Sequence, residues 1–310
     1  MKIKAWLLLT VKLFMSAFFV MYLVGKVDAV DVINGLYSTN YFLVFTAFVL
    51  LALLSVLHAA RWRAVIAMLA SSLGYLSSLR IVFIGYFFNQ VIPFSVGGDA
   101  FRSWFAYKEK VPLKDAIGSV VIDRMFAMAA LILLIILSLP VLYHILKGSD
   151  VFISIVYLVL VLVAGAVTGI FILLFGKSWG GVIGRPITLI REYMMRISGD
   201  KEKLYYALVL SVLVHIGVAL CMCLLFMAAD INIPLYFVFV MVYPVTLVSV
   251  LPVSFAGWGV REGAMVYLFE AVGIDTADSL MVSVIYGLLL IVVGLPGGIL
   301  WLRNSIRPVN

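Results

Sequence analysis

Charged side chains are scarce in this sequence of 310 residues, and their scarcity restricts the fold more than any other property. Asp, Glu, Lys and Arg make up 12% of the chain, whereas a soluble domain carries about a quarter. Apolar residues make up 65% of the chain, so too few polar side chains remain to cover a water-exposed surface. The composition therefore excludes a soluble globular protein and predicts a chain that folds within a bilayer.

Cysteine and histidine are also rare. Cys221 and Cys223 stand two apart in an apolar stretch without a nearby His or Cys, which excludes a disulfide framework. The three histidines, His58, His144 and His215, are scattered along the chain. The sequence has no Ser-His-Asp spacing, Gly-Lys phosphate loop or zinc motif. We therefore expect no catalytic residue, no metal and no cofactor.

Strict alternation of apolar and polar residues is missing too, which excludes a membrane β-barrel. Long unbroken apolar runs are present instead, and we read the first as a retained span without a cleavage site. The sequence predicts an all-α polytopic membrane protein, a single integral membrane domain over 1–310, with about 7–8 full transmembrane helices plus re-entrant or broken half-helices. The runs long enough to cross are 5–24, 41–60, 116–143, 151–175, 204–229, 235–256 and 279–302, and the short ones are 64–79, 81–94 and 260–273.

The basic residues predict the orientation of the chain. Sixteen of the 22 Lys and Arg residues, including Arg61 and Arg63, fall on one set of predicted loops, of which the connector 177–203 is the most charged. The opposite loops hold only Lys26 and Lys147. Because basic loops stay in the cytoplasm, we expect both termini to be cytoplasmic and the protein to lie in the cytoplasmic (inner) membrane. Loop cations of this kind give no reason to expect a nucleic-acid partner.

An internal two-fold repeat is visible at a shift of 159 residues, where 91–102 aligns with 250–261. Val, Pro, Ser, Gly and Arg are identical in both copies, and each copy ends an apolar run. Duplicated apolar segments interrupted by Pro or Gly are typical of transport sites in membrane proteins built from repeats. The residues expected to break the helices are Pro93, Gly97, Gly98, Pro252, Gly257 and Gly259.

Charged residues follow both breaks. A broken helix leaves backbone N–H groups unpaired, and Arg102 and Arg261 lie where they can hold a phosphate or carboxylate beside them. Asp99 and Arg102 can share one helix face. Arg261 and Glu262 are neighbours in sequence, so we expect each to need another partner.

Asp123 and Arg124 form a second polar insertion, inside the long run 116–143. Adjacent residues of a helix do not face each other, so both need partners on other helices. The pairings open to them are Asp123 with Arg102 or Arg261, and Arg124 with Asp99 or Glu262. One arginine near a helix end often only snorkels to headgroups, but two matching elements plus an intramembrane Asp-Arg favour a substrate site.

Four further residues carry weaker expectations. Asn89 precedes the first break and is suited to satisfy freed backbone groups. His58 and Trp62 fall near predicted span ends, which predicts an interfacial position for both. His215 is expected to be a hydrogen-bonded packing residue.

Three segments together give a resemblance to a known family: 93–102, 121–124 and 252–263. In their order and spacing the chain resembles the lysylphosphatidylglycerol synthase transmembrane-region family of flippase-like integral membrane proteins. The resemblance implies movement of lipid between leaflets, and stand-alone relatives are linked with sugars on polyprenyl carriers. Other members carry a soluble aminoacyl transferase. This chain stops at Asn310, so the resemblance implies no such activity here.

Three functions remain open from the sequence. In the first, Arg102, Arg124 and Arg261 guide an anionic or zwitterionic phospholipid or a polyprenyl-phosphate lipid across the bilayer, with acidic counter-ions. In the second, an intramembrane enzyme uses one of the acidic residues as a general base on a lipid phosphate. In the third, the protein is a non-transporting subunit that supports a lipid or glycan synthase. The acidic residues concerned are Asp99, Asp123 and Glu262. Whether the repeats are inverted or parallel, and the oligomeric state, stay open.

Overall fold

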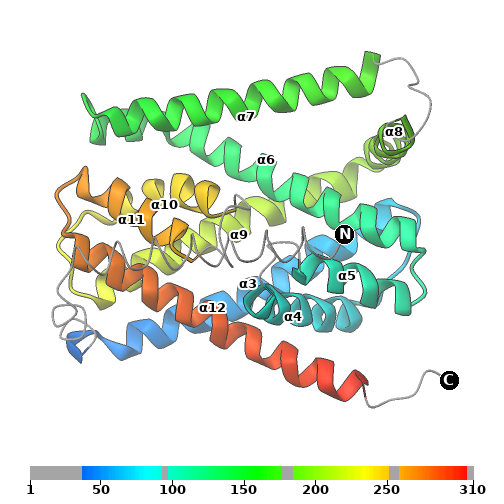
Figure 1. Ribbon diagram of the computed structural model, residues 1–310, viewed down its shortest axis with the longest axis horizontal. Helices are drawn as coiled ribbons and strands as arrows, with labels where there is room; N and C mark the ends of the chain where they lie inside the picture. Colours follow the sequence, from blue (N-terminus) through cyan, green and yellow to red (C-terminus); the bar gives the residue numbers. More distant parts are fainter. Residues whose placement is uncertain (1–36, 93–96, 176–183, 251–257, 306–310) are drawn as a thin grey trace, which may run out of the picture.

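The computed structural model describes residues 37–92, 97–175, 184–250 and 258–305, which form ten α-helices and no strand (Figure 1). The predicted all-helical class is confirmed. The helices are α3 (Tyr41–Met68), α4 (Tyr75–Val91), α5 (Gly97–Lys108), α6 (Leu113–Ile145), α7 (Asp150–Phe175), α8 (Gly184–Gly199), α9 (Lys201–Ala228), α10 (Leu235–Val250), α11 (Val260–Glu270) and α12 (Thr276–Ser305).

Five of these helices, α3, α6, α7, α9 and α12, are long and apolar enough to cross a membrane. They correspond to five of the seven predicted long runs. The first run, 5–24, lies outside the described residues, and the run 235–256 is described only as far as Val250. The protein is therefore an integral membrane protein with several spans.

The two ends of the bundle differ in charge. At one end the N–H of Asn40, before α3, donates to the carbonyl of Ala228 at the end of α9, over 2.8 Å. At the other end the Ser71 hydroxyl, after α3, contacts the Asp115 carboxylate in the first turn of α6, over 3.1 Å. We call the first the acidic end and the second the basic end. Exposed charged residues at the acidic end include Asp150, Asp230 and Asp275 beside Lys147, and those at the basic end include Lys108, Lys110 and Lys114 beside Glu109.

The short helices form two pairs, one at each end of the bundle (Figure 1). Within each pair the chain enters from one end and returns to that same end. The pair α4 and α5 belongs to the basic end, where Glu109, just after α5, contacts Ser77 and Arg80 of α4. The pair α10 and α11 belongs to the acidic end, between the end of α9 and the start of α12. With 17, 12, 16 and 11 residues, none of the four reaches the length of a full crossing. Both pairs are re-entrant.

The helix order repeats with inverted orientation. The series α3 to α6 begins at residues 41, 75, 97 and 113, and the series α9 to α12 at 201, 235, 260 and 276. Because α3 runs from the acidic end to the basic end and α9 runs the opposite way, the two halves point in opposite directions across the membrane. This resolves the alternative that the sequence left open: the repeats are inverted, as in many secondary transporters.

Each re-entrant pair packs against the last span of the other repeat, α4 on α12 and α10 on α6. The contact between α4 and α12 is the closer one. A Cβ added at Gly297 would lie 1.9 Å from the Phe83 carbonyl oxygen, and one at Gly294 would lie 3.4 Å from the Tyr86 carbonyl oxygen. Glycines allow helix backbones to approach this closely in membranes.

The prediction that 64–79 forms a separate apolar segment is wrong. Helix α3 continues through Arg61 and Trp62 to Met68, and the turn follows at Ala70, whose φ is 60°. The Arg-Trp-Arg sequence at 61–63 resembled a loop. The side chains of Arg61 and Trp62, however, bond to buried partners in the bundle, so the helix continues through them. Arg61 is therefore not a loop cation. The predicted connector 177–203 also contains a helix, α8.

Candidate functional site

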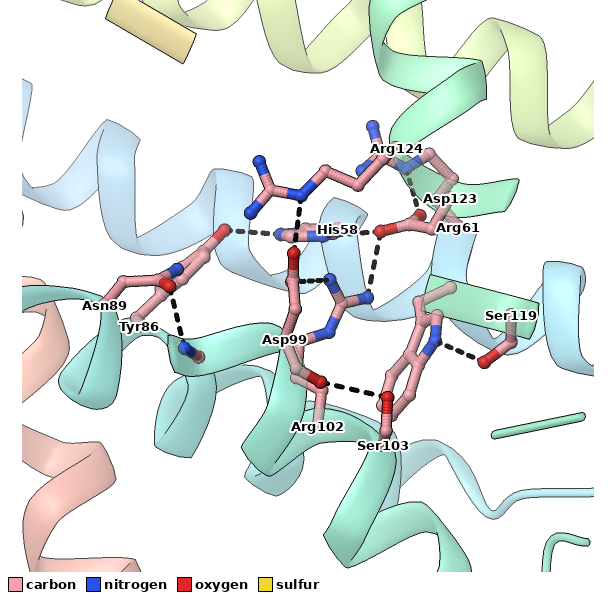
Figure 2. A network of polar contacts seen from close by, with 12 residues as sticks. His58, Arg61, Tyr86, Asn89, Asp99, Arg102, Ser103, Ser119, Asp123 and Arg124 are labelled. Carbon is pink, nitrogen blue, oxygen red and sulfur yellow. Dashed lines mark hydrogen bonds and ion pairs between the residues drawn. The ribbon is translucent and has the colours of Figure 1, made fainter. Parts of the chain in front are cut away.

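Asp123 lies at the centre of a buried network of polar residues (Figure 2). Its carboxylate accepts from Arg61 Nε at 2.7 Å, from Arg102 Nη2 at 2.9 Å and from His58 Nε2 at 3.1 Å. The donors come from α3 and α5, while Asp123 is on α6, so one carboxylate ties three helices together. A buried carboxylate needs such donors, because charge without partners is strongly disfavoured in the membrane interior.

Asp99, in the first turn of α5, holds the rest of the network. It accepts from Arg124 Nε at 2.7 Å and from Arg102 Nη1 at 3.4 Å. Arg102 thus bridges both carboxylates (Figure 2). The predicted pairings of Asp123 with Arg102 and of Arg124 with Asp99 are confirmed.

The network has an unequal number of charges. We call Arg61, Asp99, Arg102, Asp123 and Arg124 the first charge cluster. It contains three guanidinium groups and two carboxylates, which leaves one positive charge in excess. A positive charge held among helices in low dielectric favours the approach of an anion.

Two features of α4 and α5 place this cluster. The N–H of Gly98 donates to Asn89 Oδ1 at 3.0 Å, so the role expected for Asn89 is confirmed. A Cβ at Gly98 would lie 2.2 Å from the Gly85 carbonyl oxygen, so the two helices can meet this closely only with glycine there. The close approach brings Arg102 toward α3 and α6.

Trp62 forms one side of the Arg102 site. Its ring centroid lies 4.5 Å from the guanidinium carbon of Arg102, and its indole N–H donates to the Ser119 hydroxyl at 3.1 Å. The interfacial position predicted for Trp62 is wrong, because the side chain is fully buried. His58 is likewise inside the bundle, although a span end was predicted.

The second repeat carries a smaller cluster. We call Arg261, Glu262 and Ser283 the second charge cluster. Arg261 Nε donates to Glu262 Oε1 at 3.1 Å and to the Ser283 hydroxyl at 3.2 Å. Glu262 Oε2 accepts from the N–H of Gly259 at 2.6 Å, where α11 begins with a φ of 84°. The cluster has one cation and one anion, so it is balanced.

Arg261 and Glu262 each have the further partner that was expected, Ser283 and the N–H of Gly259, but they also pair with each other, which was not expected. Glu262 reaches back to Gly259, the residue before its helix, as an acidic group at this position commonly does. Its carboxylate then lies beside the Arg261 guanidinium, which also turns toward the helix start. Arg261 lies over Trp258, with 5.0 Å to the ring centroid.

Among the predicted helix breaks, Pro93, Pro252 and Gly257 lie outside the described residues.

A groove opens beside the first cluster between α5 and α6 and has a volume of about 750 Å³. It extends from Leu113 at the basic end to Val250 at the end of α10, and Asp99 and Arg124 lie on its wall. The Arg124 side chain is 45% exposed. Only its Nε has a partner among the described residues, so the two terminal nitrogens are available to a ligand (Figure 2). The remaining wall is almost entirely apolar.

Two further cavities belong to the second repeat. A groove of about 490 Å³ between α7, α10 and α11 extends from Gly259 to Glu270 at the acidic end. A smaller cavity of about 180 Å³ is lined by Arg261, and Val250 lies on its wall as well as on the groove between α5 and α6. Val250, at the end of α10, therefore lines a cavity of each repeat.

The sequence missed three residues of the site: His58, Arg61 and Tyr86. His58 Nδ1 contacts the Tyr86 hydroxyl at 2.7 Å. A signal for the first two was present, since residues 58, 61 and 62 share one face of a helix if the apolar runs around them are read as continuous. Tyr86 gives no signal in an apolar segment. The packing role expected of His215 is confirmed by its bond to the Ala127 carbonyl, 2.9 Å.

The fold and these clusters define a class: a polytopic helical membrane protein with inverted repeats, each containing a re-entrant pair and a buried arginine. Residues 9–298 match the lysylphosphatidylglycerol synthase TM region family, and the chain belongs to that family. It is 27% identical over 305 residues to a UPF0104 membrane protein from Methanocaldococcus jannaschii, covering 89% of this chain and 88% of the relative. A UPF0104 membrane protein from Methanothermobacter thermautotrophicus is 24% identical over 303 residues, with 87% and 85% covered.

Proposed function

We propose that this protein is a lipid translocator that moves an anionic or zwitterionic lipid between the two leaflets. Its partner is a membrane phospholipid or a polyprenyl-phosphate lipid. The single observation that carries the proposal is the excess positive charge of the first cluster beside an apolar groove. Such a site matches a molecule with an anionic headgroup and an apolar tail.

The position of the grooves supports a path for the lipid headgroup across the membrane. The basic end is assigned to the cytoplasm because basic segments remain there, which also makes both termini cytoplasmic. The groove between α5 and α6 then serves the inner leaflet, and the groove beside α7 and α11 serves the outer leaflet. Val250 lines both the groove that contains Arg124 and the cavity that contains Arg261, so a headgroup moving from Arg124 to Arg261 would have to pass Val250. Rocking of one inverted repeat against the other would expose the two sides in turn.

The hydrogen bonds favour translocation over lipid chemistry. A general base needs a carboxylate that is free to take a proton. Asp99, Asp123 and Glu262 instead each accept from arginine, and Glu262 also accepts from the backbone. We therefore propose a non-enzymatic function. A supporting subunit of a synthase would not need a charged cluster beside a lipid-sized groove.

The proposal can be tested in proteoliposomes with fluorescently labelled phosphatidylglycerol, followed by quenching of the outer leaflet. Arg124→Gln and Arg261→Gln remove the headgroup contacts and should each slow translocation by roughly tenfold, as expected for the loss of a charge-assisted hydrogen bond. Arg63→Gln is the matched control, because Arg63 is exposed on α3 outside both clusters. Transport unchanged in both cluster variants would contradict the proposal.

Labelled phosphatidylcholine separates the headgroup classes. An anionic substrate predicts faster movement of phosphatidylglycerol than of phosphatidylcholine, because only the former neutralises the excess charge. Mass spectrometry of the lipid before and after the assay tests the enzymatic alternative. A lipid of altered mass would show chemistry where we expect movement alone.

A further inference from the structure

We propose that His58 binds a proton that travels with the anionic headgroup, so that lipid translocation is coupled to a proton gradient. The inference rests on the proposed function and names its coupling ion. It starts from a part-buried titratable side chain that contacts Asp123 of the first charge cluster and that headgroup binding does not itself require.

The hydrogen bonds define the present state of the imidazole. His58 lies on α3 between Tyr86 of α4 and Asp123 of α6, with 2.7 Å from Nδ1 to the hydroxyl and 3.1 Å from Nε2 to the carboxylate (Figure 2). A carboxylate only accepts, so Nε2 carries the hydrogen. In the neutral ring Nδ1 accepts from the Tyr86 hydroxyl. When Nδ1 takes a proton, the hydroxyl rotates and accepts from it.

The neighbouring charges determine when a proton can bind. The groups that interact directly with His58 are Arg61, Tyr86, Arg102 and Asp123. Asp99 and Arg124 join them through Arg102, while His215 of α9 and Tyr286 of α12 interact with Arg61 and Tyr86 respectively. The charged ones already sum to one positive charge. A proton would add a second, which is unfavourable in low dielectric. An anionic headgroup at Arg124 offsets that charge and thereby favours protonation.

The hydrogen bonds to Asp123 link protonation of His58 to the position of Arg102. Asp123 is shared between His58, Arg61 and Arg102. A protonated His58 forms a full ion pair with Asp123, which weakens the hold of the carboxylate on Arg102. Arg102 can then turn toward the headgroup. Proton binding and anion binding thus strengthen each other, and by thermodynamic linkage the effect is reciprocal.

A binding experiment tests the inference without transport. Purified protein in weakly buffered detergent is mixed with short-chain phosphatidylglycerol, and proton uptake is followed with a pH-sensitive dye. We expect a proton uptake that rises with lipid binding and reaches at most about one proton per lipid, the limit for a single titrating site. His58→Gln should bind lipid without uptake, because an amide keeps hydrogen bonds but does not titrate. His215→Gln is the matched control, a second part-buried histidine whose side chain bonds, within the described part of the chain, to the Ala127 carbonyl, and should behave as the wild type.

A transport experiment tests the coupling. In proteoliposomes, the ratio of translocation rates with and without an imposed pH gradient should exceed one in the wild type and fall to one in His58→Gln. The inference is overturned if the wild type takes up no proton or if His58→Gln retains the uptake or the gradient response. If uptake depends on His58 but labelled lipid does not move in the wild type, the proton site stands and the proposed translocation is contradicted.

Discussion

The first and second charge clusters are built on the same plan and differ in their charge. In each, an arginine at the beginning of the returning helix lies over a tryptophan, with a glycine facing it from the helix behind. The corresponding residues are Arg102, Trp62 and Gly85 in the first cluster and Arg261, Trp258 and Gly287 in the second.

The difference lies in the counter-ions. The second cluster is complete within α11 and one hydroxyl of α12, and its charges cancel. The first draws charges from α3, α5 and α6 and keeps one positive charge in excess. The comparison teaches that the inverted repeat keeps the arginine, whereas its tryptophan and glycine neighbours come from different positions in the two halves and the surrounding spans determine the electrostatics. An anion is attracted to the first cluster and meets a balanced site in the second.

The largest expected effect is on stability, from removal of the charge of one carboxylate in each cluster, Asp123 in the first and Glu262 in the second. Asp123→Asn leaves Arg61 and Arg102 without their shared carboxylate and should destabilise the protein by about 3–5 kcal/mol, the usual cost of breaking a buried ion pair. Glu262→Gln strands only Arg261 and should cost less. Thermal unfolding in detergent measures both. Equal losses would show that the two clusters do not differ as the counter-ions indicate.

The second-largest expected effect is on the stability that comes from packing of each re-entrant pair against the last span of the other repeat, as in α4 against α12. Gly297→Ala places a Cβ against the backbone of Phe83, and overpacking of this kind costs about 1–3 kcal/mol or more. Gly169→Ala is the matched control, since nothing lies within 4 Å of a Cβ there. Unfolding temperatures that match in the two glycine variants would contradict the close contact of α4 and α12.

A third prediction separates function from stability inside the first cluster. The Arg61 side chain is 4% exposed and that of Arg124 is 45% exposed. Arg61→Gln should therefore lower the unfolding temperature, whereas Arg124→Gln should leave it nearly unchanged and weaken phosphatidylglycerol binding by roughly tenfold. Lipid binding can be followed by native mass spectrometry. Loss of stability in Arg124→Gln would show that this arginine is structural.

The smallest effect is a pH dependence at α8, remote from both clusters. Lys114 Nζ donates to Glu192 at 2.9 Å and holds the pKa of that carboxyl below its ordinary 4.5. A lowered pKa stabilises the fold above pH 4.5, and this contribution is lost as the pH falls through the folded value. Glu192→Gln should therefore unfold slightly earlier than the wild type near neutral pH. The difference should vanish in acid, and a difference that grows in acid would contradict the pairing.

The apolar runs predicted most of the fold because a crossing helix leaves an unmistakable length of apolar sequence. The pairings around Asp123 and Asp99 were also predictable, since adjacent charges on one helix must find partners elsewhere. Arg61 and Trp62 were not, because a basic and aromatic sequence is typical of an interface, and only tertiary contacts show that it is buried. The inversion of the repeats depended on whether 64–79 crosses the membrane, which the loop charges could not decide.

The contact between α4 and α12 also affects how the protein is made. The first re-entrant pair leaves the ribosome early, but the glycine-lined surface of α12 that receives α4 is synthesised last among the described helices. Until then α4, which carries Arg80, lacks the partner that covers it. The first half of the protein must therefore wait in the membrane, or beside the insertion machinery, for the end of its own translation.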